Sequence, residues 1–389
     1  SARQHLLVSW SCRDERTGEA LEASTPVRQW LDLLPQISVR EHAANPLDRR
    51  NFLPSKLWPS SSCDRRLLKV RQQLDQGVLK PVTGLAMSST AQEVGKPSQE
   101  EPSLGAWEDL QAWLKAPQKH WLEQLGLRPR ESERSLLDLE NLSLDERLRS
   151  ALLRRELEAK QNDNGELSDP SWVTLEHGRG TLPALSAGAL EARLLDLRWS
   201  SLEHCLQQLG CEHTEAVRVG TLEAEVPKRG DQLVLIHTAK PRSAQRLELW
   251  LQLLLTTAAG VSPHAAVLVG RDGHQFRVLE RIRPPSPEEA RGILSQLQQW
   301  RADYQCKCWP LPPDTGWAFA AGEARGKGWS KARAAWEGNL MVRGEREDAV
   351  QQVCFGSDMS LDDLLTDTNQ ELALSLYAPL LTHHQEVKG

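Results

Sequence analysis

One segment constrains the fold more than any other. Leu247–Val261 is the most apolar stretch of the chain, and short strand-like runs lie on both sides of it. Glu248 and Gln252 interrupt its apolar character, which favours a half-buried helix over a helix that faces lipid. The predicted order is a hairpin of strands 216–226 and 233–237 around a 228–231 turn, a helix at 244–257, and a second strand pair at 265–269 and 276–282. Helices around a small central sheet place this region in the α/β class.

Apolar residues at steps of three and four predict further amphipathic helices outside this central region. The expected ranges are 26–34, 107–125, 136–159, 185–209, 286–304, 328–336 and 361–376, and residues 6–10 are expected to form a short buried strand. Residues 88–103 have the composition of a linker, so we place a domain boundary near residue 105. The 389 residues would then form two domains, 1–105 and 106–389.

Charge and cysteine content exclude several classes of protein. The chain has 47 Lys and Arg against 53 Asp and Glu, a net charge of -6, so any polyanion site must be a local patch. Its seven cysteines show no regular spacing, and no apolar signal-peptide core is present, which favours a reducing cytoplasm. No apolar run is long enough for a membrane span. The chain opens at Ser1 without an initiator methionine, so we expect a fragment of a longer protein.

Common catalytic and metal-binding motifs do not occur in the sequence. Cys205, Cys211 and His213 form one loose group and Cys306 and Cys308 another, but neither has the paired spacing of a strong zinc site. The glycine-rich stretch 322–328 is one residue short of a phosphate-binding loop and lacks its hydroxyl residue. Zinc-protease helices and serine nucleophile elbows do not occur either. The sequence therefore predicts neither a bound cofactor nor an ATP site.

The predicted hairpin and the helix after it have the layout on which metal-dependent nucleases carry their ligands. Such an enzyme needs an acidic residue on the first strand, and then an Asp or Glu followed two residues later by Lys on the second. The first strand offers Glu223, but His237 stands in place of the second carboxylate and Ala239 in place of the lysine. Without those ligands the site would not hold Mg²⁺. The alternative interpretation of these residues is a surface hairpin with a histidine at the end of a strand.

A rival interpretation is an active nuclease with a different set of ligands. In that set Glu223, Glu225 and Asp231 would supply the carboxylates and Lys240 the lysine. Metal-dependent degradation of linear DNA would distinguish the two interpretations.

The segment Ala335–Glu345, AWEGNLMVRGE, closely resembles a signature near the C-terminus of the RecC family, the gamma subunits of exodeoxyribonuclease V. Further pieces agree in the same order: Leu7–Trp10, Asn51–Phe52, Trp113–Trp121, Leu182–Pro183 and Leu249–Leu251. Together they cover nearly the whole chain, which is similar to the C-terminal third of such a subunit.

This resemblance implies the end of a degenerate helicase-like region, followed by a RecB-like nuclease domain of the PD-D/ExK type that has lost catalysis. His237 and Ala239 agree with that loss, and Ala116 stands where iron–sulfur members of the group carry cysteine. Arg13 lies near the place of an ATP-contacting arginine, but no ATPase role is assigned to it. The resemblance also implies a scaffold that binds RecB-like and RecD-like subunits and guides double- and single-stranded DNA during double-strand break repair and recombination.

Two basic segments are candidates for DNA contact, because a DNA channel needs fixed cations along the phosphate path. The first, residues 49–80, carries Arg49, Arg50, Lys56, Arg65, Arg66, Lys69, Arg71 and Lys80 against Asp64 and Asp75. A solvated loop and helix is the alternative for this segment. The second, residues 325–346, includes Arg343 and is open to either DNA contact or a structural role. A protein-interaction module without DNA contact is the remaining rival.

Overall fold

The computed structural model describes residues 8–12, 19–34, 36, 39, 43, 45–53, 62, 64–76, 84–87, 105–129, 142–162, 172–339 and 342–387. The chain divides into two compact units, Ser1–Lys80 and Pro81–Gly389. The predicted boundary near residue 105 lies inside the second unit. Leu85 and Ala86 pack against that unit's core, and the backbone at Gly84 lies so close to Cys354 and Phe355 that a Cβ atom would not fit there.

The first unit contains helices α1 (Thr25–Leu33) and α2 (Arg65–Asp75) and the short helix η1 (Arg49–Asn51). Among its described residues only Ala23 and Asn51 are buried. The predicted helix at 26–34 is confirmed as α1. The predicted strand at 6–10 is wrong at Val8–Trp10, which form no strand, and its first two residues lie outside the described part of the chain. A strand needs a neighbour for its backbone groups, and no described strand pairs with residues 8–10.

The second unit is built on a mixed sheet of six strands in the order β1-β2-β3-β4-β5-β6. The strands are β1 (Glu212–Val219), β2 (Leu222–Arg229), β3 (Gln232–His237), β4 (Ala265–Asp272), β5 (Gln275–Ile282) and β6 (His384–Glu386). Strands β3 and β4 run parallel and are joined through helix α9 (Ser243–Ala258), whereas the other neighbours are antiparallel. Strands β1 and β6 form the two edges of the sheet.

The first predicted hairpin is wrong in one respect, because its first strand is two strands. Val219 pairs with Leu222, and the chain reverses between them at Gly220 and Thr221. Gly220 has a φ of +61°, a conformation that glycine adopts without strain and that suits a two-residue hairpin turn. Strands β1, β2 and β3 therefore form a meander, and Glu223 lies on its second strand. The second predicted pair is confirmed as β4 and β5, with Gly273 in their turn.

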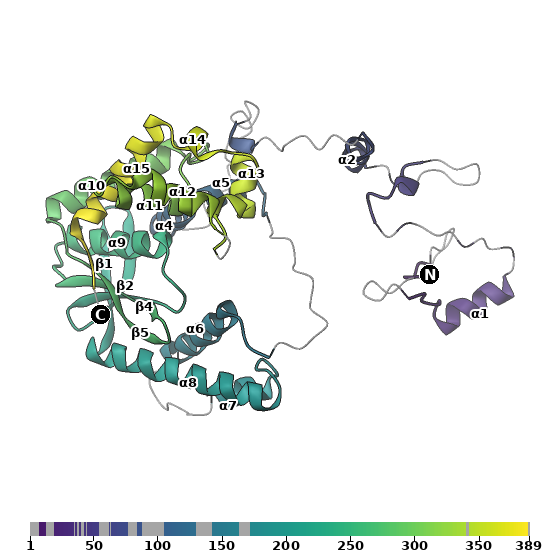
Figure 1. The fold of residues 1–389 in the computed structure, drawn as a ribbon, viewed down its shortest axis with the longest axis horizontal. Coiled ribbons are helices and arrows are strands. Elements are labelled where there is room, and N and C mark those ends of the chain that lie inside the picture. The colour runs from purple at the N-terminus through teal and green to yellow at the C-terminus, as the bar shows by residue number, and fades with distance from the viewer. Residues whose placement is uncertain are drawn as a thin grey trace. The chain divides into compact units, whose positions relative to one another are not determined.

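Two hydrophobic cores cover the two faces of the sheet, and side-chain alternation decides which residue enters which core. Along β4, Ala266 and Leu268 enter the first core, whereas Val267 and Val269 enter the second. The first core lies under α9 and the helices α4 (Ala106–Lys115), α5 (Pro117–Gln124), α10 (Pro287–Asp303) and α11 (Pro313–Glu323), and the second lies under α6 (Glu146–Asn162), α7 (Trp172–Gly178) and α8 (Leu185–Gln208). Figure 1 shows these helices on opposite sides of the sheet.

Further helices complete the first core: α12 (Gly328–Glu337), α13 (Ala349–Phe355), α14 (Leu361–Leu364) and α15 (Asp367–His383). The short helix η3 (Glu345–Glu347) precedes α13. The predictions for α8, α9, α10 and α12 are confirmed to within two residues. The predicted helix at 361–376 is two helices, because Thr366 leaves the helical conformation and caps α15 by accepting a hydrogen bond from the Asn369 amide.

Two other predicted helices need correction. The helix predicted at 107–125 breaks into α4 and α5 at Ala116, because Pro117 disfavours a helical conformation for the residue before it. The helix predicted at 136–159 begins at Glu146, where the Asp145 carboxylate accepts a hydrogen bond from the Leu148 amide at 2.7 Å. Residues 136–141 lie outside the described part of the chain. No described helix is both long and apolar enough to cross a bilayer.

Candidate functional site

Two of the three degenerate nuclease positions, His237 and Ala239, lie at the end of strand β3, and the third, Glu223, lies on β2. His237 is the last residue of that strand and is half-buried, and Ala239 follows two residues later, also half-buried. The intervening Thr238 is buried, and its hydroxyl donates to the Ser150 carbonyl at 2.9 Å, which fastens the end of β3 to helix α6. Glu223 is exposed on β2.

A polar group of four side chains, which we call the β3-end cluster, occupies this region: Gln111, Lys115, His237 and Glu248. The Lys115 ammonium lies 2.8 Å from the Glu248 carboxylate, and the Gln111 amide donates to the same carboxylate at 3.3 Å. Lys115 therefore neutralises the carboxylate that α9 places near His237. The arrangement is a neutralised ion pair beside a histidine.

Burial is the main cause that lowers the pKa of His237. The charge of Glu248 acts in the opposite direction, and the positive charges of Arg154, Lys115 and Arg242 lower the pKa further. His237 is therefore a neutral imidazole at neutral pH, able to donate one hydrogen bond and accept one.

The ligands of the rival nuclease set do not converge. Glu223 stands near the start of β2, whereas Asp231 lies in the turn after that strand ends at Arg229. The stretch of strand from Glu223 to Arg229 has a length of roughly 20 Å. Among the residues placed in the structure, no three His, Cys, Asp or Glu side chains gather in a way that could hold a metal ion.

The first basic segment divides into two groups of side chains. Arg71 lies 2.6 Å and Arg49 lies 3.4 Å from the Asp75 carboxylate, and Arg50 pairs with Asp48 at 3.0 Å. The hydrogen bond from Arg71 is the largest cause that lowers the pKa of Asp75. Arg49 and Arg71 hold the loop before α2 against the helix, whereas the pair of Arg50 with Asp48 lies within the loop. Lys56 and Lys80 lie outside the described residues.

The other group, Arg65, Arg66 and Lys69, lies in the first turns of α2, and we call it the α2 cationic end. All three side chains are exposed, and none forms an ion pair with another residue that the structure describes. Asp64 caps the helix by accepting hydrogen bonds from the amides of Arg66 and Leu67. Cations at a helix N-terminus oppose the helix dipole, and this end of α2 presents three of them beside the single carboxylate of Asp64.

In the second basic segment, the chain turns tightly between Gly338 and Gly344, and we call this turn the signature loop. A backbone bridge joins Gly338 to Arg343. Gly338 has a φ of +71°, and a Cβ atom there would collide with the backbone of Val342 and Gly344. The Arg343 guanidinium contacts Glu347. Residues 340 and 341 lie outside the described part of the chain.

The loop ends at Glu345, a residue whose role sequence patterns did not indicate. Its carboxylate accepts hydrogen bonds from the backbone amides of Asp314 at 3.1 Å and Thr315 at 2.7 Å, which are amides of the first turn of α11. Burial, followed by the negative charge of Asp314, raises the pKa of Glu345 to about 7. Because 30 residues separate Thr315 from Glu345, no local capping motif marked this contact.

Comparison with known protein families gave one match. The sequence model of a family described as the RecC C-terminal domain matches residues 106–324. That range begins at helix α4 and ends just after α11, so it contains strands β1 to β5 and the β3-end cluster. A search of curated proteins gave no match.

Proposed function

Because the chain belongs to the RecC family, whose members are subunits of the RecBCD complex, we propose that it is a non-catalytic scaffold and DNA-guiding part of such a complex. In this role it would bind RecB-like and RecD-like subunits and contact double- and single-stranded DNA during double-strand break repair and homologous recombination. The fold would be that of a RecB-like nuclease without its metal ligands.

One observation carries the non-catalytic part of this proposal. At the end of β3, His237 and Ala239 replace the carboxylate and lysine of the nuclease pattern, and Glu248 is already paired with Lys115 at 2.8 Å. The order of three antiparallel strands, a helix and a parallel strand supports the nuclease-like fold. A neutral histidine and a neutralised ion pair supply neither a cation cage nor an activated water.

The DNA-guiding part rests on the α2 cationic end. Phosphate contacts by Lys and Arg release counterions from DNA, and such contacts need side chains that are not already paired. Arg65, Arg66 and Lys69 meet that requirement among the described residues, whereas Arg49 and Arg71 are engaged with Asp75. We therefore assign phosphate contact to the first three and a structural role to the other two.

The test uses the purified chain, linear DNA and Mg²⁺ or Mn²⁺. We expect no DNA degradation, and binding that weakens as salt increases. The triple variant Arg65→Glu, Arg66→Glu, Lys69→Glu should lower DNA affinity at least tenfold. It should also make the slope of log affinity against log salt concentration shallower by about one for each phosphate that is no longer neutralised.

A control variant carries the same change in net charge at exposed positions of the second unit: Lys119→Glu, Arg193→Glu and Arg283→Glu. It should bind DNA within about threefold of the original chain, since only local charge is removed. Unchanged affinity in the first triple variant would favour a protein-interaction module without DNA contact. Metal-dependent degradation that disappears in Glu223→Ala would instead establish the active nuclease.

A further inference from the structure

Two cysteine side chains of the second unit lie in contact with each other. The Cys308 thiol is hydrogen-bonded to the Cys354 thiol. Cys308 is half-buried in the connection between α10 and α11, whereas Cys354 is fully buried in α13. Both take part in the first core, where Cys308 packs against its buried members. The structure thus pairs Cys308 with a cysteine far along the chain rather than with its sequence neighbour Cys306.

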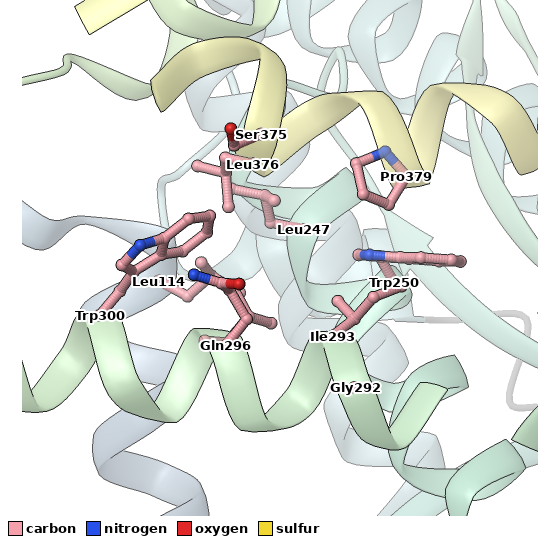
Figure 2. A pocket seen from close by; sticks show the side chains of 11 residues that line it. Leu114, Leu247, Trp250, Gly292, Ile293, Gln296, Trp300, Ser375, Leu376 and Pro379 are labelled. Atoms are coloured by element: carbon pink, nitrogen blue, oxygen red, sulfur yellow. The ribbon is translucent and has the colours of Figure 1, made fainter. Parts of the chain in front are cut away.

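The connection that carries Cys308 is held in place next to the thiol. The Gln118 amide of α5 donates to the Trp309 carbonyl at 2.9 Å. Figure 2 shows Trp300 on α10, and its ring meets the Trp309 ring with 5.9 Å between the centroids. These contacts from α5 and α10 keep Cys308 at the place where α13 presents Cys354.

The two thiols need only a small movement to form a disulfide. An S–S bond is about 2 Å long, and two thiols in hydrogen-bond contact already have sulfur atoms that face each other. Cys308 lies outside the regular helices, so its backbone can supply this movement while Cys354 stays inside α13.

Both groups are stored as thiols at neutral pH. Contact with Cys354, followed by burial, raises the pKa of the Cys308 thiol. The thiolate is the reactive form, so the pair reacts slowly and only with a small oxidant that can reach a half-buried sulfur. Once one sulfur is oxidised, the other attacks it within the same molecule, and proximity favours that step.

We propose that Cys308 and Cys354 form a redox modification site, which hydrogen peroxide converts into an intramolecular disulfide. The more accessible Cys308 reacts first: its thiol gives up a proton, the sulfur attacks one peroxide oxygen, and the O–O bond breaks. Cys308 becomes a sulfenic acid, and the released hydroxide takes up the proton as water. The Cys354 sulfur then loses its proton and attacks the Cys308 sulfur, the S–O bond breaks, and a second water leaves. Two thiols are oxidised, and one peroxide is reduced to two waters.

The disulfide would tie α13 to the connection before α11. It would thereby close the part of the chain that contains α11, α12 and the signature loop. Such a cross-link stabilises the folded state, mainly by restricting the unfolded chain. The inference concerns a modification of the chain itself, so it stands or falls independently of DNA binding and of the RecB-like and RecD-like subunits.

The experiment treats the purified chain with hydrogen peroxide under native conditions, blocks the remaining thiols, and identifies linked peptides by mass spectrometry. The main disulfide should join Cys308 to Cys354 and should disappear on reduction with dithiothreitol. The oxidised chain should unfold at a temperature about 5 °C higher than the reduced chain, because the cross-link restricts the unfolded state.

Cys306→Ser is the matched control, since Cys306 is also half-buried and lies in the same connection. This variant should form the same disulfide and show the same rise in unfolding temperature. Cys308→Ser should show neither, and Cys354→Ala should leave Cys308 as a sulfenic or sulfinic acid.

The unmodified chain alone decides the outcome, so a variant that fails to fold does not obscure it. If peroxide leaves Cys308 and Cys354 unlinked in the native chain, or links either of them mainly to another cysteine, the inference is overturned. A link between them that forms only in denaturant would overturn it as well.

Discussion

The two basic segments look alike in sequence and differ in structure. At the α2 cationic end, Arg65, Arg66 and Lys69 are exposed and form no ion pair with a described residue. In the signature loop, by contrast, the backbone turns tightly between Gly338 and Gly344, and Arg343 contacts Glu347. An arginine can thus remain on a helix without a described ion-pair partner, as Arg65 does, or pair locally beside a tight turn, as Arg343 does.

The largest expected effect tests whether the signature loop is structural. Gly338→Ala should lower the free energy of unfolding by about 3 kcal/mol or more, because the new Cβ atom collides with backbone and φ is positive. Gly326→Ala is the control, since Gly326 has a similar φ of +62° but open space around it, and it should cost roughly 1–2 kcal/mol. Denaturant unfolding measures both. If the two variants lost the same free energy of unfolding, the backbone at Gly338 would not be tightly packed.

A second test concerns the carboxylate that ends the loop. The folded protein holds the pKa of Glu345 at about 7, whereas an unfolded glutamate has a pKa of about 4.3. The folded state thus binds this proton more tightly, so the stabilisation is full below about pH 4 and is lost as pH rises through about 7. The Glu345→Gln side chain cannot ionise, so the variant does not lose this stabilisation as pH rises, and it keeps one hydrogen-bond acceptor.

The stability difference between Glu345→Gln and the original chain should therefore change by about 3 kcal/mol in favour of the variant between about pH 4 and about pH 8. Thermal unfolding of both proteins across that range measures it. A difference that stays constant with pH would show that Glu345 titrates normally and that its contact with α11 is weak.

The smallest expected effect compares single arginines from the two segments. Arg65→Ala should weaken DNA binding about threefold and reduce the salt slope by about one, as expected when one phosphate is no longer neutralised. Arg343→Ala should leave both quantities unchanged within error, because its guanidinium is engaged with Glu347. Fluorescence titration at several salt concentrations measures both variants. If Arg343→Ala weakened DNA binding and Arg65→Ala did not, the DNA contact would lie at the signature loop instead.

Sequence periodicity predicted the elements whose pattern is local. The apolar run around Trp250 predicted α9 to within a residue, and the strand runs around it predicted the centre of the sheet. Periodicity does not mark the turn at Gly220 that separates β1 from β2, nor the break at Ala116 before Pro117. In both places one residue that frees or restricts the backbone ends the element while the apolar pattern continues.

The site was predicted less completely, because its contacts join distant parts of the chain. His237 and Ala239 have the spacing of a nuclease pattern, so they can be found in the sequence. The ion pair of Lys115 with Glu248 joins α4 to α9, and these helices are separated in the chain by strands β1, β2 and β3. The first basic segment contains both paired and unpaired cations, and Asp48 and Asp75 decide which arginines are paired. Asp75 reaches Arg71 because both lie on α2, four residues apart, so this pair exists only once the helix is formed.

The edges of the sheet limit how another protein can attach. Strand β1 carries the charged or polar side chains of Glu212, His213, Glu215 and Arg218, and β6 is only three residues long. Charged or very short edges discourage the addition of a foreign strand, which would have to place its own backbone beside those charges. Both edges of this sheet are therefore closed to a guest strand, and changing single side chains elsewhere on the surface would leave the sheet's own pairing intact.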